Sequence, residues 1–280
     1  HTVNGNLVVT SDAGAITQSA ALTVSGTSSF TTTTAGDNIT LSTTTNAFTG
    51  AVSISTSGTA DVAIDNGTTA LNLGTVTVGQ NLTATSGEAI TDSGVITVGG
   101  TTAAFTTDVA DKAITLDSQN AITGAVTFVT SGTGGDVSFD NGTTAISLGS
   151  VAGLAGDLTL LTDAAQTISS AINLTGTGAA LSITVDNGNA LNVQAALTTG
   201  TGNITLSADD DVIFTAAGDI TSTSGNISVT ADDDATSDAG SGGALTMADG
   251  TVFDAGSGTL TGIADEDITL GQMTTTNATT

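Results

Sequence analysis

The chain has 280 residues, with no proline, cysteine, tryptophan or tyrosine, and a formal net charge of −26 from 27 acidic residues against a single lysine. Such a chain cannot neutralise phosphates, which excludes nucleic acid as a partner, and an anionic membrane surface would repel it. It contains no run of 18 apolar residues that could cross a membrane as a helix. Cations, uncharged glycans and other proteins remain as partner classes.

Short apolar runs that alternate with Thr, Ser or Ala recur along the chain and are separated by Gly- and Asn-rich turns. This alternation predicts half-buried β-strands, and no segment shows the periodicity of a helix. In the clearest part of the chain the strands are expected, in order, at residues 82–85, 95–98, 104–107, 113–117, 125–129, 137–140 and 145–148.

The strands belong to long, imperfect repeats. The segment NAFTGAVSISTSGTADVAIDNGTTALNLG at Asn46 recurs at Asn120 as NAITGAVTFVTSGTGGDVSFDNGTTAISLG, about 75 positions later. A third copy begins near Asp157 but lacks about 29 residues, and GNITLSADDD at 202–211 recurs as GNISVTADDD at 225–234. Coils of roughly 20–29 residues, averaging near 25, reconcile these shifts. The full repeat would then hold three coils, the shortened repeat two, and the chain about eleven.

A coil of short strands cannot bury its apolar face alone, so it must stack on its neighbours and align equivalent side chains into ladders. The sequence therefore predicts an all-β fold, a single right-handed parallel β-helix (β-solenoid) over residues 1–280. Its super-repeats are expected at about 1–75, 76–150 and 151–200, the last one coil shorter, followed by divergent coils at 201–280. The inward ladders are expected to include Val126, Phe128, Ile114, Leu116, Ile146 and Leu174.

The phrases NLTATSGEAITDSGVITVGGTTAAF, NAITGAV, ALNLGTVTVG and GNITL resemble the repeats of large bacterial filamentous-haemagglutinin-type exoproteins, which are secreted by the two-partner route. The resemblance covers about residues 1–230. It implies a right-handed β-helix shaft, an extracellular or cell-surface location, roles in adhesion, aggregation or biofilm, and an outer-membrane transporter as secretion partner. The secretion-signal region of that family is not found in this sequence, and we expect the chain to be a window of a longer protein.

Two acidic runs form the candidate metal site. Their 23-residue spacing is one coil, so they are expected to stack on adjacent turns, where like charges repel unless a cation or water lies between them. Carboxylate oxygens suit Ca²⁺, a hard ion. A solvated corner with splayed carboxylates is the other interpretation, and both stay open. The residues concerned are Asp209, Asp210, Asp211, Asp232, Asp233 and Asp234.

Asp-Asn-Gly triplets begin at Asp65, Asp140 and Asp186. They invite a calcium interpretation, but Asn-Gly is also the favoured pair for a type I′ or related turn, because both central residues of a type I′ turn need positive φ. We favour the turn, at a corner of the coil. The triplets also lie coils apart, so they would not share an ion.

An enzyme is the remote alternative, because polysaccharide-active β-helix enzymes have this fold. They need clustered carboxylates with a basic residue or Ca²⁺ in a groove. Lys112 is expected to be a solvated surface charge, and His1 lies at the chain end, where a general base is poorly positioned. The sequence therefore predicts no catalytic residue and no cofactor beyond the Ca²⁺ hypothesis.

The favoured function is the structural shaft of an extracellular or cell-surface bacterial fibre or adhesin, able to assemble into filaments. Its expected partners are further solenoid in the same chain or other copies, associated end to end or laterally. The alternative is a solenoid module that binds a glycan or receptor on one face. Few aromatic residues are available for stacking on sugars, since the chain has only seven phenylalanines.

Overall fold

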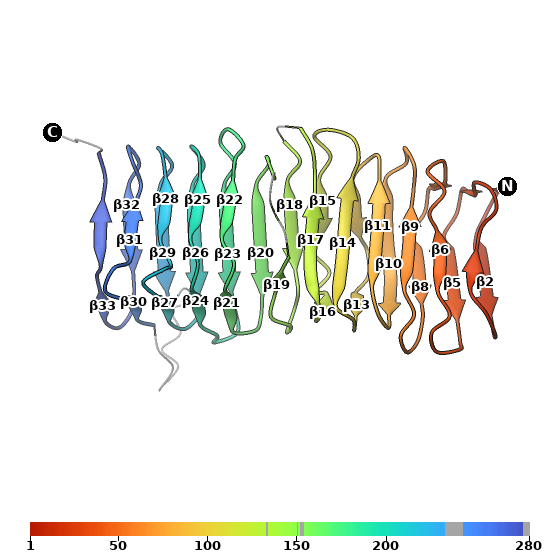
Figure 1. The fold of residues 1–280 in the computed structure, drawn as a ribbon, viewed down its shortest axis with the longest axis horizontal. Coiled ribbons are helices and arrows are strands. Elements are labelled where there is room, and N and C mark those ends of the chain that lie inside the picture. Colours follow the sequence, from red (N-terminus) through yellow and green to blue (C-terminus); the bar gives the residue numbers. More distant parts are fainter. Residues whose placement is uncertain (133, 150, 152–153, 233–242, 277–280) are drawn as a thin grey trace. The chain divides into compact units, whose positions relative to one another are not determined.

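The computed structural model describes residues 1–132, 134–149, 151, 154–232 and 243–276. The chain forms two compact units, His1–Asn141 and Gly142–Thr280. Each unit is a stack of parallel β-strands (Figure 1), and the described residues of the two units make about eleven turns of a β-solenoid, without helix. The all-β solenoid class is thus confirmed. No helix capable of spanning a membrane occurs among the described residues. The continuity of one solenoid through both units stays a prediction.

Three faces of parallel strands, which we call sheets A, B and C, build the first unit. Sheet A holds β1 (Thr2–Val3), β4 (Thr23–Val24) and β7 (Ala47–Phe48). Sheet B holds β2 (Leu7–Ser11), β5 (Ser28–Thr32), β8 (Val52–Ser55), β10 (Leu71–Val78), β12 (Ile90–Asp92), β15 (Ile114–Leu116) and β18 (Val137–Asp140), with a branch in which β13 (Ile96–Val98) pairs with β10 and β16 (Ala121–Ile122) pairs with β13. Sheet C holds β3 (Ile16–Thr17), β6 (Ile39–Leu41), β9 (Val62–Asp65), β11 (Leu82–Ser86), β14 (Thr102–Thr107) and β17 (Ala125–Val129).

The second unit begins with β19 (Ser147–Leu148) and continues as five coils of three strands each. The first strands of these coils pair with one another in the order β20 (Leu158–Thr162), β23 (Leu181–Val185), β26 (Ile204–Ala208), β29 (Ile227–Ala231) and β32 (Leu260–Ile263). The second strands are β21 (Gln166–Ile168), β24 (Leu191–Val193), β27 (Val212–Phe214), β30 (Leu245–Met247) and β33 (Ile268–Thr269). The third strands are β22 (Ile172–Leu174), β25 (Leu197–Thr199), β28 (Ile220–Ser222), β31 (Val252–Asp254) and β34 (Gln272–Thr274).

Strand register fixes the length of a coil. Leu158 pairs with Leu181, Leu181 with Ile204, and Ile204 with Ile227. Each of these steps is as long as the sequence shift at which GNITLSADDD recurs, so that shift is one coil, as predicted. The next step, from Ile227 to Leu260, is longer because a longer connection joins β29 to β30 than joins β26 to β27.

The 75-residue repeat does not contain a whole number of coils. Three pairing steps lead from Leu7 only to Leu73 in sheet B, whereas the sequence counterpart of Leu7 in the next copy is Leu82. The residues of the repeat that remain after three coils do not complete a fourth coil. The next sequence copy therefore begins on a different face of the solenoid. Leu7 of β2 accordingly lies in sheet B, while Leu82 of β11 lies in sheet C. The expectation of three whole coils per repeat is wrong because the coils of this unit are shorter than assumed.

Alternation within each strand places apolar side chains in the core. In β17, Val126 is 0 % and Phe128 2 % exposed, Thr127 is half-buried, and Val129 is 48 % exposed. Phe105 pairs with Phe128 in the neighbouring strand, and their ring centroids lie 6.0 Å apart in a stacked arrangement. The predicted inward residues are all buried, namely Val126, Phe128, Ile114, Leu116, Ile146 and Leu174. Each such side chain contributes roughly 1.5–3 kcal/mol of burial free energy.

Corners of successive coils approach too closely for a side chain at some glycines. A Cβ atom added to Gly225 would lie 1.9 Å from the carbonyl oxygen of Gly202, and one added to Gly202 would lie 1.9 Å from that of Ala179. The glycine at these positions is thus required by the stacking of the backbone, not by positive φ.

Candidate functional site

The first acidic run lies on a corner of the second unit, between β26 and β27. Ala208 pairs with Ala231 in the next coil, so the two runs begin at equivalent positions of adjacent turns, as predicted. The Asp209 carboxylate accepts a hydrogen bond from Gly188 N at 3.3 Å, in the preceding coil. Asp211 Oδ1 accepts from Gly243 N at 3.0 Å and Ala244 N at 2.9 Å, in the following coil. Two of these carboxylates therefore bind backbone amides.

The metal hypothesis for this corner stays a prediction. Asp210 and Asp232 are described, and the backbone N–H of Asp232 donates to the carbonyl oxygen of Asp210 at 3.4 Å. Asp233 and Asp234 lie outside the described residues. Within the residues that are described, no group of three or more His, Asp or Glu side chains is arranged to hold a metal ion.

Other acidic and amide side chains at strand starts join one coil to the next. Asn38 Oδ1 accepts from Asp61 N at 2.8 Å, Asp61 Oδ1 from Asn81 N at 3.1 Å, and Asn81 Oδ1 from Thr102 N at 3.1 Å. In the second unit, Asn203 and Asn226 repeat the arrangement, each accepting from a backbone N–H of the following coil. Backbone dipoles thus stabilise part of the acidic surface, and the contacts fix the strand register.

The first two Asp-Asn-Gly triplets lead into turns, as expected, but the turns are not of type I′; at the first triplet, Thr69 N donates to Asn66 O at 3.1 Å. Asn66 and Asn141 are completely buried, and in each triplet only the glycine has positive φ, +56° at Gly67 and +50° at Gly142. Asn66 Oδ1 accepts from Phe48 N at 2.7 Å and Asn66 Nδ2 donates to Phe48 O at 3.1 Å. Asn141 makes the same pair of bonds with Ile122, at 2.9 and 3.0 Å.

These side chains act as amide brackets, a name we use for Asn66, Asn141 and Gln166. Gln166 binds the backbone of Ile146 in the same way, at 2.7 Å to the N–H and 2.8 Å to the carbonyl. A bracket supplies the acceptor and the donor that a missing strand would provide, and at Phe48 and Ile122 it so satisfies the backbone where a ladder ends. An amide is needed because only Asn and Gln combine a donor and an acceptor in this geometry.

The third triplet follows the sequence prediction. Asn187 and Gly188 both have positive φ, +65° and +67°, as a type I′ turn requires, and both are exposed to solvent. The same three letters therefore produce two different structures, depending on whether a ladder end lies beneath them.

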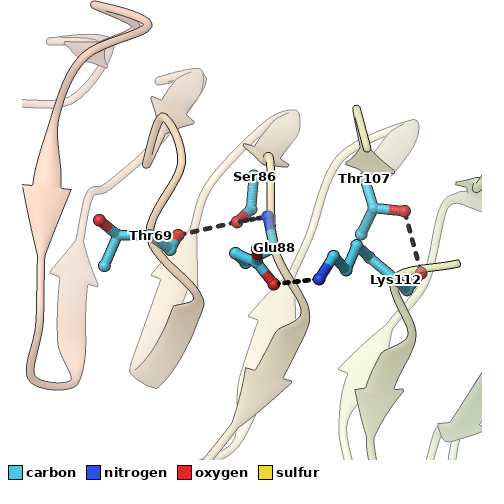
Figure 2. Close-up of polar contacts among 5 residues, drawn as sticks. All are labelled: Thr69, Ser86, Glu88, Thr107 and Lys112. Carbon is cyan, nitrogen blue, oxygen red and sulfur yellow. Dashed lines mark hydrogen bonds and ion pairs between the residues drawn. The ribbon is translucent and has the colours of Figure 1, made fainter. Parts of the chain in front are cut away.

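The chain's single lysine pairs with an acid from the adjacent coil. Lys112 Nζ lies 2.6 Å from Glu88 Oε2, with the two side chains 30 % and 42 % exposed (Figure 2). Lys112 is thus paired rather than simply solvated. Hydroxyl groups at the ends of β11 and β14 also form hydrogen bonds close to this ion pair (Figure 2). Ser86 Oγ donates to Thr69 O at 2.9 Å, and Thr107 Oγ1 donates to Lys112 O at 3.1 Å.

Two hollows of the described structure lie beside strand edges. One, of about 290 Å³, opens at the first coil of the first unit and is lined mainly by apolar residues such as Leu7, Val9 and Phe30, with the exposed His1 at its rim. The other, of about 250 Å³, lies between β19 and β21 and is lined by hydroxyl and amide side chains, including Ser147, Gln166 and Thr167. Lys112 and the acidic runs line neither hollow.

Comparison with known proteins gives a repeat family. Residues 1–55 and 59–129 match a family described as repeats of unknown function (DUF5649). The matched residues are less than half of the chain. The two matches end at Ser55 in β8 and Val129 in β17, which are corresponding points of the two sequence copies. No curated protein and no solved structure matches the chain. The chain is therefore a repeat protein, and the β-solenoid assignment depends on the parallel strand pairing within the chain itself.

Proposed function

We propose that this chain is the structural shaft of an extracellular or cell-surface bacterial fibre or adhesin. The observation that supports it best is that inward side chains, corner contacts and ladder ends all serve the stacking of coils. Asn66 closes a ladder, Gly225 permits close corners, and Asp61 caps the next strand. Contacts that mainly hold successive coils together suit a protein whose function is to extend over a distance and to bear mechanical load.

Solenoid energetics favour this role. Each coil contacts only its neighbours, so the stability of each unit grows coil by coil, and length can be added without redesigning a core. The charge of −26 keeps such a rod soluble and opposes lateral clumping. Expected partners are further solenoid in the same chain or other copies of it. The resemblance to filamentous-haemagglutinin-type repeats supports a surface location and secretion through an outer-membrane transporter.

A glycan- or receptor-binding face is the weaker proposal. All seven phenylalanines, the chain's only aromatic residues apart from His1, are at most 2 % exposed, which leaves none for stacking on sugars. Binding through the outward hydroxyl groups would have to proceed without aromatic platforms.

The proposal is tested on intact producing cells with antibodies against this chain, followed by cryo-electron microscopy of material shed from the surface. We expect extracellular label on thin fibres whose repeat matches stacked coils. Label confined to the cell interior would overturn the proposal. Strains carrying Phe128→Asp, which disrupts the core, and Val129→Asp, on the outer face of the same strand, form a matched pair. Only the first should abolish fibres and reduce cell aggregation.

A further inference from the structure

The three Asp-Asn-Gly triplets differ in how readily their asparagine can deamidate, a known reaction of the Asn-Gly pair. The backbone nitrogen that follows an asparagine can attack the side-chain amide, and glycine permits this best because it has no Cβ to obstruct the approach. We propose that Asn187 is a site of spontaneous modification to aspartate and isoaspartate, whereas the fold protects Asn66 and Asn141.

Protection at Asn66 and Asn141 follows from the amide brackets. Both side chains are 0 % exposed, and each forms two hydrogen bonds with a strand residue of the neighbouring coil, one to its N–H and one to its carbonyl group. The Asn66 side chain could reach the Gly67 nitrogen only by breaking both bonds and leaving the Phe48 peptide groups buried without partners. Gly67 N is also engaged, since it donates to Asp65 Oδ1 at 2.7 Å.

Asn187 has neither the burial nor the bracket bonds of Asn66 and Asn141. It lies at an exposed turn, and the space around Gly188 is open, with no atom within 4 Å of an added Cβ. Gly188 N makes only a long bond of 3.3 Å to the Asp209 carboxylate. The corner is held instead by Asn189, whose Nδ2 donates to the carbonyl oxygens of Asp163 at 2.9 Å and Asp186 at 3.0 Å. The Asn187 side chain can therefore react without unfolding the coil.

The reaction balances with water as the only co-reactant. Gly188 N loses its proton to solvent and bonds to Cγ of Asn187, while the bond from Cγ to Nδ2 breaks and the leaving nitrogen takes up a proton from solvent and departs as ammonia. The resulting cyclic imide takes up one water molecule at either carbonyl, giving aspartate or isoaspartate. One ammonia is lost, one water is gained, and nothing is oxidised or reduced. The product adds one negative charge beside Asp186 and Asp209, and the isoaspartate form lengthens the backbone of this corner.

The test is peptide mapping by mass spectrometry of the full chain after incubation in mildly alkaline buffer, folded and in denaturant. In the folded protein we expect modification at Asn187 and intact amides at Asn66 and Asn141. In denaturant all three should react at similar rates, because their sequences are the same. Equal rates in the folded state, or an unreacted Asn187 there, would overturn the proposal.

Two glycine variants separate attack by the Gly188 nitrogen from general loosening of the chain. Gly188→Ala should slow the reaction at Asn187 severalfold, because its Cβ obstructs the attack. Gly178→Ala is the matched control, since Gly178 also has positive φ (+79°) and open surroundings but follows no asparagine. An unchanged rate at Asn187 in Gly188→Ala, or an equal slowing in Gly178→Ala, would contradict the proposed attack.

Discussion

The side chain of Asn66 holds the backbone of Phe48 through two hydrogen bonds, one to its N–H and one to its carbonyl group. Phe48 belongs to β7, the last strand of sheet A. Asn141 holds Ile122 in the same way, and Ile122 belongs to β16, where the branch of sheet B ends. A ladder of the solenoid can thus stop inside the stack without leaving buried peptide groups unsatisfied.

Replacing a bracket should therefore be costly. Asn66→Ala removes both bonds and leaves the Phe48 N–H and carbonyl buried without partners, so we expect a loss of about 2–5 kcal/mol in the free energy of unfolding. Chemical denaturation of the full chain measures it. Asn187→Gly is the control, because the same triplet is exposed there and glycine tolerates the positive φ of +65°; it should change stability by less than about 0.5 kcal/mol. Similar losses in both variants would contradict the bracket role.

Phe128 and Val129 test the core assignment within one strand. Phe128→Asp buries a carboxylate and opens a cavity, and should cost about 3–5 kcal/mol or more. Val129→Asp places the same charge on a side chain that is 48 % exposed and should leave thermal unfolding nearly unchanged. If Phe128→Asp unfolds at the same temperature as the parent chain, the assignment of an inward ladder is wrong.

Close stacking of corners predicts a position-dependent cost of adding one methyl group. Gly225→Ala would place Cβ 1.9 Å from the Gly202 carbonyl oxygen, so the coils must move apart, and we expect a loss of about 1–3 kcal/mol. In Gly200→Ala the nearest atom is 3.7 Å away, an ordinary contact. Urea titration of both variants should therefore show a lower midpoint only for Gly225→Ala, and equal midpoints would argue against close corner stacking.

The Lys112–Glu88 ion pair should contribute little to stability, despite its 2.6 Å length. Both side chains are partly exposed, and pairs of this kind are worth about 0.2–1 kcal/mol. A double-mutant cycle with Lys112→Met and Glu88→Gln measures the coupling, which should shrink further at high salt. A coupling well above this range that is insensitive to salt would mean that the pair is far better shielded than its exposure indicates.

Calcium binding at the acidic corner is checked by calorimetric titration and by melting with and without chelator. If the runs hold Ca²⁺, the ion should release or absorb heat and raise the melting temperature, and Asp210→Asn should weaken both effects. Asp249→Asn, an exposed acid elsewhere in the second unit, is the control and should not. An absence of heat together with an unchanged melting temperature excludes the site.

The sequence predicted the features that depend on local pattern. Alternation placed Val126 and Phe128 inward and Val129 outward, and the recurrence of GNITLSADDD fixed one coil length, because both signals lie within a strand or between adjacent coils. Strands β12 and β16, only three and two residues long, carry too little alternation and were not predicted.

The brackets could not be predicted from local pattern, because Asn66 and Asn187 stand in the same triplet. Which of them is buried depends on whether a strand end, such as Phe48, lies beneath it in the previous coil. The register of the long repeat was missed for a related reason. Corner loops vary in length, so coils differ in their number of residues. The number of coils in a repeat therefore cannot be obtained by dividing the repeat length by one coil length. The pairing step from Leu71 to Ile90, for example, is shorter than the step that follows it, from Ile90 to Ile114.

The mismatch between repeat and coil bears on how such a chain can grow by recombination. Gain or loss of one 75-residue copy would advance everything downstream by an incomplete revolution and present it in a new direction. Gain or loss of a copy that spans two whole coils, such as the stretch from Leu158 to Ile204, would change length while conserving orientation. In-frame insertions or deletions would thus be of two kinds. One kind would change the orientation of the downstream residues about the solenoid axis, and the other would change only their position along the axis.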